Sequence, residues 1–236
     1  MATRKIEGIL FDKDGTLIDF NGTWLPAYRE SARRLARRCR QPDLEDLLLI
    51  EGGWNPTDGN WQAGSLLASG SNREIVDFWS QRCGNITYNE VEEIVFQTFH
   101  EHSSREYRTI AKAERRIVEL KQQGYQIGMA TMDDAVTAHS TVSALNLEEY
   151  FDFVCGADSG YGVKPDAGMV IAFCQAVDLK AEQVMMVGDS PHDLNMGRAA
   201  GVGLVVGVLS GAHDRAHLEP LADHILNDIS ELQSIL

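Results

Sequence analysis

Short apolar runs and amphipathic segments alternate along most of this chain. The apolar runs occupy residues 5–12, 125–131, 151–156, 184–188, 202–208 and 224–226. Runs of this length bounded by Gly or Asp predict buried strands of a parallel sheet. The segments between them carry apolar residues at helical spacing, at residues 110–123, 133–145, 166–177 and 194–200. Strands that alternate with helices predict an α/β fold, in which helices cover both faces of a parallel sheet.

Residues 23–104 interrupt this alternation, because they show helical periodicity and no convincing buried strand. Within them we expect helices at residues 28–40, 44–50, 71–83 and 89–102. A loop at residues 51–64 holds several glycines together with two tryptophans. We therefore expect a core domain made of residues 1–22 and 105–236, with residues 23–104 as an inserted helical subdomain.

Composition excludes some classes of function but does not identify the activity. The chain has 236 residues, of which 44% are hydrophobic, enough to bury a sizeable core. Its formal net charge of -14 argues against general nucleic-acid binding, which requires a basic surface. No apolar stretch approaches membrane-spanning length and no signal-peptide pattern is visible, so we expect a soluble cytoplasmic protein without a membrane partner. The four cysteines lack metal-ligand spacing and are expected to be reduced, partly buried thiols. Nothing in the sequence indicates an oligomeric state.

Asp12 and Asp14 follow the first predicted strand, one residue apart, and precede Gly15. In open α/β sheets, chemistry takes place just beyond the carboxyl ends of the strands. Two carboxylates there can divide the work, one as nucleophile or metal ligand and the other as acid and base. Gly15 permits a tight turn that keeps both near the strand end. The alternative is an ordinary Asp-Gly turn.

Two further loops carry groups that suit an anion. Thr131 and Met132 end a predicted strand just before a helix, where a hydroxyl and free backbone N–H groups can bind phosphate. The alternative there is a plain helix cap. Lys164 precedes Pro165 at a predicted helix start, and it is either a fixed cation for phosphate or a solvated lysine.

Asp189 and Asp193 supply further carboxylates at the end of another predicted strand. With Asp12 they would form an all-oxygen cluster suited to Mg²⁺ and not to zinc. Carboxylates that meet without a cation repel one another and titrate abnormally. The agreement of motif and position across all four loops indicates a working site.

With these four loops, the chain resembles the haloacid dehalogenase-like hydrolase superfamily, most of all its phosphoglycolate phosphatase-like branch with a helical cap. The resemblance spans nearly the whole chain. It rests on Asp12-Lys13-Asp14-Gly15-Thr16, Thr131, Lys164-Pro165 and Gly188-Asp189-Ser190-Pro191-His192-Asp193. It implies a Rossmann-like three-layer core with a cap inserted after the first motif, in agreement with the helical residues 23–104.

The resemblance also implies roles for the residues that match these motifs. Asp12 would be the nucleophile that forms an aspartyl-phosphate. Asp14 would protonate the leaving alcohol and then activate water. Thr131 would hold the phosphoryl oxygens with backbone amides, and Met132 and Thr16 would be further substrate-binding residues.

A cation and a metal complete the implied site. Lys164 would neutralise the charge of the nucleophile and the phosphoryl group. Mg²⁺ would be bound by the carboxylates of Asp12 and Asp189 and by the backbone carbonyl of Asp14, while Asp193 would support the metal or Lys164 from behind. These roles imply an Mg²⁺-dependent phosphatase of a small phosphorylated metabolite, with phosphoglycolate as the first candidate.

Two positions depart from the pattern of the superfamily. Relatives often have Asn after the Thr or Ser of the second motif, whereas Met132 and Asp133 follow Thr131 here. Lys13 lies between two aspartates and would point away from Asp12 if strand geometry persists. We interpret Lys13 as structural or as part of the rim, not as catalytic.

Other activities on the same fold fit less well or stay open. A dehalogenase would need neither Asp14 nor magnesium. A phosphonatase would need a cap lysine, and residues 23–104 contain none. A sugar phosphomutase keeps all four motifs and is the nearest enzyme alternative. A catalytically silent binding module is the alternative from another class of function.

Two features of the inserted segment have more than one interpretation. The cluster Arg33, Arg34, Arg37, Arg38 and Arg40 forms either an anion-attracting surface or, as we prefer, a solvated helix face. The glycine-rich loop carries Trp54, Asn55 and Trp61, which either line a substrate cleft or anchor the small core of the cap.

Overall fold

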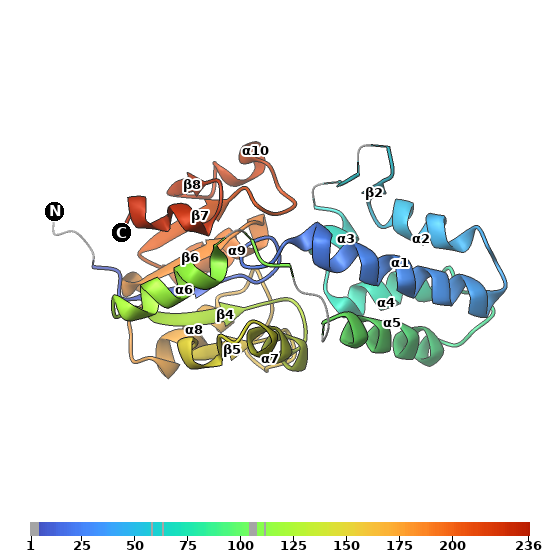
Figure 1. Ribbon diagram of the computed structural model, residues 1–236, viewed down its shortest axis with the longest axis horizontal. Coiled ribbons are helices and arrows are strands. Elements are labelled where there is room, and N and C mark those ends of the chain that lie inside the picture. Colours follow the sequence, from blue (N-terminus) through green and yellow to red (C-terminus); the bar gives the residue numbers. More distant parts are fainter. Residues whose placement is uncertain (1–4, 58, 63, 104–107, 111) are drawn as a thin grey trace. The chain divides into compact units, whose positions relative to one another are not determined.

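The computed structural model describes residues 5–236 apart from residues 58, 63, 104–107 and 111 (Figure 1). Its contacts divide the chain into two compact units. We call Met1–Asp19 with Arg108–Leu236 the core unit, and Phe20–Tyr107 the helical unit. Each unit has its own secondary structure and its own hydrophobic core, so the two are described one after the other.

The core unit contains a six-stranded sheet in the order β5-β4-β1-β6-β7-β8, in which every strand pair is parallel. Its strands are β1 (Gly8–Phe11), β4 (Gln126–Ala130), β5 (Phe153–Cys155), β6 (Val184–Gly188), β7 (Leu204–Val208) and β8 (His224–Leu226). All six predicted strands are present in the described chain. The predicted α/β fold with a parallel sheet is therefore confirmed.

Strand β1 is central, with β4 on one side and β6 on the other. All its residues are buried, which explains why its sequence is an apolar run without polar alternation. Phe11, its last residue, pairs with Met129 of β4 and Val187 of β6. Because the three strands run parallel and in this register, the residues that follow them emerge at one edge of the sheet.

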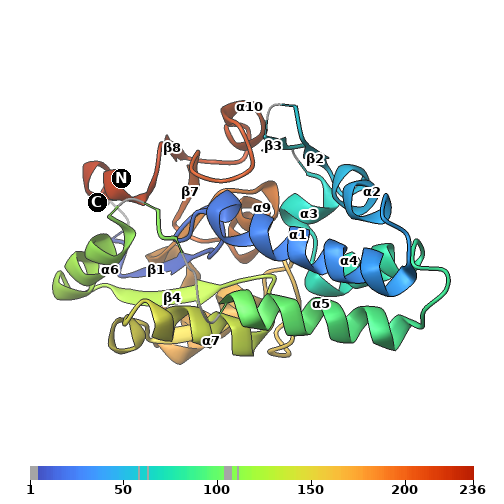
Figure 2. The same ribbon diagram turned by 45° about the vertical axis from the view of Figure 1, so that its right-hand side comes forward.

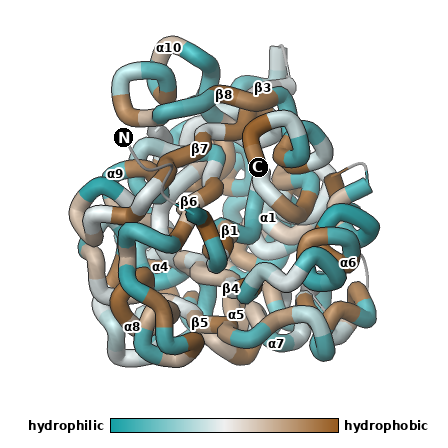
Figure 3. The backbone as a smooth tube through the Cα atoms, turned by 90° about the vertical axis from the view of Figure 1, so that its left-hand side faces the viewer, coloured by the Kyte–Doolittle hydropathy of each residue, from teal (hydrophilic) through white to brown (hydrophobic). Residues whose placement is uncertain are grey.

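Helices cover both faces of this sheet. In Figure 3, α6 (Ala113–Gln122) and α7 (Ala135–Ala144) lie on one side of the strands, and α8 (Gly168–Ala176) and α9 (Pro191–Ala200) on the other. Shorter elements are α10 (Arg215–Leu218) and the 3₁₀ helices η1 (Glu148–Tyr150), η2 (Ala181–Gln183) and η3 (Ile229–Ser234). Strand β7 carries hydrophobic colours in Figure 3, whereas α6 is largely hydrophilic, as expected for a helix with one solvent face.

Two helices near the predicted site begin elsewhere than the sequence suggested. Helix α9 begins at Pro191, not at residue 194, because Ser190 caps it. The Asp193 N–H donates to the Ser190 hydroxyl, and the Asp193 carboxylate accepts from the Ser190 N–H. Helix α8 begins at Gly168, so Pro165 lies in the loop before the helix, where its bond to Lys164 is cis.

The two ends of the core unit that connect to the inserted segment are tied to each other. The Asp19 N–H donates to the carbonyl of Arg108 at 2.7 Å, and the Ile110 N–H donates to the carbonyl of Leu17 at 3.0 Å. These backbone hydrogen bonds belong to the core unit alone. The chain thus leaves and re-enters the core at adjacent points.

The helical unit contains α1 (Phe20–Cys39), α2 (Leu44–Glu51), α3 (Leu66–Ser69), α4 (Asn72–Ser80) and α5 (Tyr88–Ser103). Helix α1 packs against α2 and α5, and α5 also packs against α4 (Figure 2). A short antiparallel pair, β2 (Trp54–Asn55) and β3 (Asn60–Trp61), lies in the predicted loop. The sequence did not indicate this pair, because two residues are too few to show a strand period.

Helix α1 begins at Phe20, eight residues before its predicted start at residue 28. Gly22 and Pro26 are poor helix formers and favoured a turn. Phe20, Trp24 and Tyr28 are nonetheless buried and four residues apart on one helix face, with the rings of Trp24 and Tyr28 stacked at 5.9 Å. The packing of this aromatic face outweighs the local propensity.

Two expectations drawn from composition can be compared with the structure. The four cysteines, Cys39, Cys83, Cys155 and Cys174, are all free and buried, which agrees with the prediction of reduced thiols. Among the helices of the described residues, none combines the length and the apolar character needed to cross a bilayer.

Phe173 of α8 tests the core between this helix and the sheet. Its side chain is 0% exposed, whereas Ile171 of the same helix is 48% exposed. We expect Phe173→Ala to lower the free energy of unfolding by about 3–5 kcal/mol, because burial is lost and a cavity remains. Ile171→Ala, the matched control, should change it by less than about 0.5 kcal/mol. Urea unfolding followed by circular dichroism measures both, and equal losses would contradict the assigned packing.

Candidate active site

Three residues predicted to belong to the site follow neighbouring strands at one edge of the core sheet. Asp12 follows β1, Thr131 follows β4 and Asp189 follows β6. The Asp12 N–H donates to the carbonyl of Val187 at 2.9 Å, which extends the contact between β1 and β6 past the end of the strand. The parallel register therefore gathers these residues, as the sequence predicts for the carboxyl ends of strands.

Lys164 is buried between two carboxylates. Its Nζ lies 2.5 Å from Oδ1 of Asp12 and 2.6 Å from Oδ1 of Asp193, and its side chain is 1% exposed. The other oxygen of Asp193 accepts hydrogen bonds from the Ser190 N–H at 3.1 Å and the Ser190 hydroxyl at 2.6 Å. Lys164 is thus a fixed, buried cation and not a solvated lysine.

The charges of this cluster are not balanced. Burial, together with the charge of Asp193, raises the pKa of Asp12 to about 7 against the opposing effect of Lys164. Burial and the charges of Asp12 and Asp193 raise the pKa of Asp189 well above its ordinary value. Burial alone would lower the pKa of Lys164, but its two ion pairs raise it. One lysine does not compensate three buried carboxylates, so the site favours a further cation.

The oxygen atoms available at the site suit Mg²⁺. Carboxylate oxygens of Asp12, Asp189 and Asp193 lie within 4.8 Å of one another. Among the described residues, Oδ2 of Asp12 and Oδ1 of Asp189 have no hydrogen-bond partner, whereas both oxygens of Asp193 are engaged. An all-oxygen donor set beside uncompensated negative charge fits a hard divalent cation. The Asp14 carboxylate lies outside this group, so a ligand from that residue would be its backbone carbonyl.

Gly15 makes the turn after Asp14 possible. Its φ is 80°, a conformation that favours glycine. Its N–H donates to the carbonyl of Ile18 at 2.7 Å, and its carbonyl accepts from the hydroxyl of Ser210 at 2.6 Å. A Cβ at this position would lie 2.6 Å from Oδ2 of Asp189. Only glycine therefore allows the turn to pack directly on this carboxylate.

The loop that follows β7 also contacts the site, and the sequence analysis missed it. The Ala212 N–H donates to Oδ2 of Asp189 at 2.9 Å, and a Cβ at Gly211 would lie 1.8 Å from the same oxygen. Residues 201–211 are apolar and carry no chemical motif. The available signal was topological, because every loop after a strand of a parallel sheet reaches the same edge.

The groups predicted to bind phosphate differ in their availability. The Thr131 N–H donates to the carbonyl of Cys155 at 3.1 Å, and the Thr131 hydroxyl accepts from the Asp133 N–H at 3.1 Å. In the part of the chain that the structure describes, the Met132 N–H has no acceptor. Thr16 is fully buried, and its hydroxyl has no hydrogen-bond partner among the same residues. The Met132 amide is therefore better placed for an anion than the amide of Thr131.

Lys13 is fully buried, so the interpretation that places it at the rim is wrong. Its Nζ lies 2.7 Å from Oδ2 of Asp14 and 2.7 Å from Oδ2 of Asp133. Burial raises the pKa of Asp133 to about 6, although the charge of Lys13 opposes this. The two buried lysines thus serve different carboxylates, Lys13 the one of Asp14 and Lys164 the one of Asp12.

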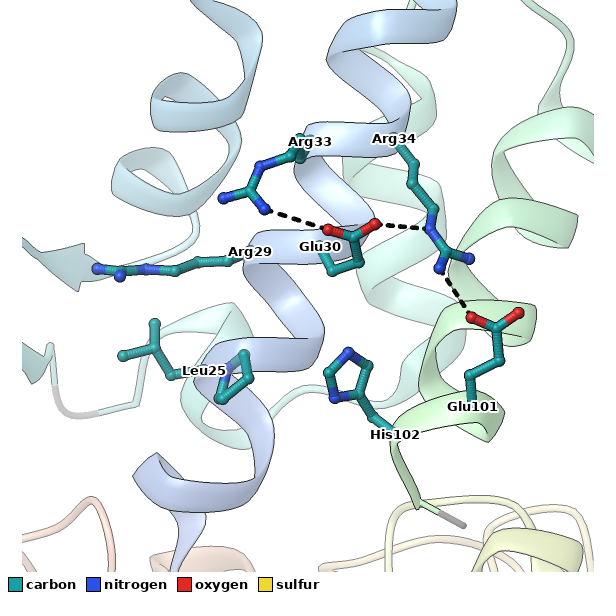
Figure 4. A pocket seen from close by; sticks show the side chains of 8 residues that line it. Leu25, Arg29, Glu30, Arg33, Arg34, Glu101 and His102 are labelled. Atoms are coloured by element: carbon teal, nitrogen blue, oxygen red, sulfur yellow. Dashed lines mark hydrogen bonds and ion pairs between the residues drawn. The ribbon is translucent and has the colours of Figure 1, made fainter. Parts of the chain in front are cut away.

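Arginines of α1 are paired with acidic residues of the helical unit. Arg33 lies 3.2 Å and Arg34 3.0 Å from the carboxylate of Glu30, and Arg34 also lies 2.8 Å from Glu101. Figure 4 shows these side chains around a depression of about 590 Å³, with both guanidinium groups directed at Glu30. The pairing supports the interpretation as an ion-paired, solvated helix face.

The two tryptophans of the glycine-rich loop pack inside the helical unit. Trp54 is 7% and Trp61 8% exposed, and their ring centroids are 4.9 Å apart. The ring of Trp61 also meets Phe20 and Tyr28 edge-on at 5.8 and 5.6 Å. These contacts support the role of anchoring the small core, whereas Asn55 between them is exposed.

Solved structures with the same fold are numerous. A predicted phosphoglycolate phosphatase from Haemophilus somnus 129PT superposes with a TM-score of 0.76 and 21% identity, covering 100% of this chain and 99% of that one. A predicted β-phosphoglucomutase from Thermotoga maritima has a TM-score of 0.73 and 21% identity over 98% and 100% of the two chains. These similarities confirm the fold class, a Rossmann-like core with an inserted helical unit.

Sequence comparison adds the family. The chain matches the haloacid dehalogenase-like hydrolase family over residues 6–201. It is 30% identical over 239 residues to the pyrophosphatase PpaX of Bacillus mycoides strain KBAB4, covering 98% of this chain and 97% of the relative. The pyrophosphatase PpaX of Bacillus cereus strain B4264 is also 30% identical, over 241 residues and the same shares. The chain belongs to the haloacid dehalogenase-like hydrolases, as its motifs predict.

Lys164 tests the electrostatics of the site independently of any activity. We expect Lys164→Met to lower the free energy of unfolding by about 3–5 kcal/mol, because Asp12 and Asp193 lose their buried partner. Lys180→Met removes an exposed lysine and should change it by less than about 0.5 kcal/mol. Urea unfolding in the presence of EDTA compares the two. If both variants are as stable as the wild type, Lys164 does not compensate the buried carboxylates.

Proposed function

We propose that the protein is an Mg²⁺-dependent phosphoric monoester hydrolase that acts on a small phosphorylated metabolite through an aspartyl-phosphate. The observation that carries this proposal is the buried contact of Lys164 with Asp12, beside the second carboxylate of Asp189. A carboxylate and a phosphate ester are both anionic, so attack requires fixed positive charge at the point where they meet. The family of the chain supports the same conclusion.

Asp12 and Asp189 would hold Mg²⁺ together with the backbone carbonyl of Asp14. When bound, Mg²⁺ supplies positive charge that offsets the negative charge of the phosphoryl oxygens. Lys164 offsets the charge of Asp12, and Asp193 keeps Lys164 in place through its ion pair. This division of roles agrees with the hydrogen bonds, which leave oxygens of Asp12 and Asp189 available.

The phosphoryl group would be held by hydrogen-bond donors of the loops after β1 and β4. The Met132 amide has no acceptor among the described residues, and the Thr16 hydroxyl has no partner among them either. Thr131 accepts from a backbone amide, so its hydroxyl proton can be donated to a phosphoryl oxygen. These donors stabilise the charge that spreads over the phosphoryl oxygens during transfer.

Two carboxyl groups suffice for the covalent steps. A carboxylate oxygen of Asp12 attacks phosphorus, the bond from phosphorus to the leaving oxygen breaks, and Asp14 gives that oxygen its proton. Asp14, now ionised, takes a proton from a water molecule whose oxygen attacks the phosphorus of the aspartyl-phosphate. The bond between phosphorus and Asp12 breaks, inorganic phosphate leaves, and both carboxyl groups return to their initial state.

Phosphoglycolate is the first candidate substrate, because the motifs resemble that branch and a similar structure carries that description. Inorganic pyrophosphate is the second, because the relatives at 30% identity are named pyrophosphatases. Phosphoryl transfer within a sugar phosphate is the third, since a predicted β-phosphoglucomutase shares the fold. All three reactions would use the same catalytic groups. The two hydrolyses transfer the phosphoryl group to water and differ in the leaving group, whereas a mutase transfers it to a sugar.

A substrate panel with and without metal tests the proposal. We expect the protein to release inorganic phosphate from phosphoglycolate only when Mg²⁺ is present. Addition of EDTA should stop the release, because the negative charge of Asp12 and Asp189 is then no longer offset. A higher kcat/KM for pyrophosphate than for phosphoglycolate would favour pyrophosphate as the substrate. Isomerisation of a sugar phosphate without net phosphate release would identify a mutase. No turnover of any compound in the panel, p-nitrophenyl phosphate included, would contradict an enzymatic function.

Asp12→Asn tests the nucleophile. The amide is a far weaker nucleophile than the carboxylate, so we expect kcat to fall by at least about 10³-fold while the circular dichroism spectrum is unchanged. Asp178→Asn removes an exposed aspartate and should retain wild-type turnover. Hydrolysis of p-nitrophenyl phosphate by the Asp12→Asn variant at an appreciable fraction of the wild-type rate would exclude Asp12 as the nucleophile.

A further inference from the structure

We propose that Lys13 and Asp133 are positioning residues that hold the Asp14 carboxylate in the orientation needed to protonate the leaving oxygen. The inference rests on the proposed function, since it concerns the acid and base of that reaction. It starts from a chain of two ion pairs. Lys13 Nζ lies 2.7 Å from Oδ2 of Asp14 and 2.7 Å from Oδ2 of Asp133, and the Lys13 side chain is 0% exposed.

Lys13 forms an ion pair with Asp14, one of the two aspartates between which it lies. Strand β1 ends at Phe11, and Lys13 lies in the bend that follows, with its ammonium on Asp14 and Asp133. Asp12 already has a buried cation in Lys164. Lys13 instead reaches Asp14, whose side chain is 18% exposed at the site. The two lysines therefore divide the work between the nucleophile and the acid.

Asp133 is itself fixed by the backbone on which it lies. Its N–H donates to the Thr131 hydroxyl at 3.1 Å, and its carbonyl accepts from the Ala157 N–H at 2.7 Å. Its side chain is 9% exposed, so its carboxylate is nearly as dry as the ammonium it pairs with. Lys13 thus links the loop after β4 to the turn after β1 that carries Asp14.

Stability alone does not account for this arrangement. Buried ion pairs repay their loss of hydration poorly, and apolar side chains of similar volume often stabilise a protein as well or better. A pair of charges buried beside an acid that transfers a proton can instead fix its orientation, which proton transfer requires.

The sensitivity to the leaving group separates positioning from a purely structural role. Phenyl phosphate and p-nitrophenyl phosphate are similar in size, but the phenolate of the first is the more basic and depends more on protonation as it leaves. We expect Lys13→Met/Asp133→Asn, which removes both charges together, to lower kcat/KM for phenyl phosphate at least about tenfold more than for p-nitrophenyl phosphate. A structural role would lower both values by the same factor. The matched control is Lys180→Met/Asp178→Asn, which makes the same two substitutions at exposed positions. It should leave kcat/KM for both esters unchanged.

A double-mutant cycle completes the test. Asp14→Asn should show the same selective loss for phenyl phosphate, and Lys13→Met/Asp133→Asn added to it should cause no further selective loss, because the group to be positioned is gone. Equal losses for both esters, or an additive selective loss in the Asp14→Asn background, would overturn the positioning role while the phosphatase stands. If Asp14→Asn itself shows no selectivity, Asp14 is not the acid, and the proposed mechanism fails with the inference. If the wild type hydrolyses neither ester and releases no phosphate from any compound of the substrate panel, the proposed function fails, and the inference fails with it.

Discussion

Burial of charge at one edge of the parallel sheet is the constraint on which the core unit depends. Carboxylates there are removed from water, and such groups are stable only when cations or hydrogen-bond donors replace the lost hydration. Lys164 meets part of this need by contacting Asp12 and Asp193 at once. Because the compensation is incomplete, the same edge favours a further cation. The stability of the edge and its chemistry thus rest on the same contacts.

The surrounding backbone is shaped to bring these charges together. Register alone gathers Asp12, Thr131 and Asp189 from neighbouring strands. The turn at Gly15 and the loop after β7 then close over Asp189, with the Ser210 hydroxyl joining one to the other. The site is therefore made by five loops of one sheet edge, and four of them carry recognisable motifs. The fifth, the loop after β7, contributes a backbone N–H at Ala212 and a glycine without a side chain at Gly211. No sequence pattern predicts either contribution.

The limits of sequence interpretation follow from where the information lies. The strands, the parallel sheet and the motifs at Asp12, Lys164 and Asp189 were predictable, because each depends on a local run followed by a polar residue. The start of α1 at Phe20 was not predictable, because its aromatic face stabilises the helix only by packing against residues distant in the sequence. The contact of Lys13 with Asp133 was not predicted for the same reason, because it forms only when the fold brings the loops after β1 and β4 together.

The hydrogen bonds between Asp19 and Arg108 and between Leu17 and Ile110 have a consequence for the evolution of this architecture. They close the core beneath the point of insertion, so the sheet keeps its register without help from the segment between them. An insertion of another length or fold could enter at the same point at little cost to the core. The helical unit behaves in this sense as an exchangeable cassette, which can be replaced in evolution without rebuilding the core sheet.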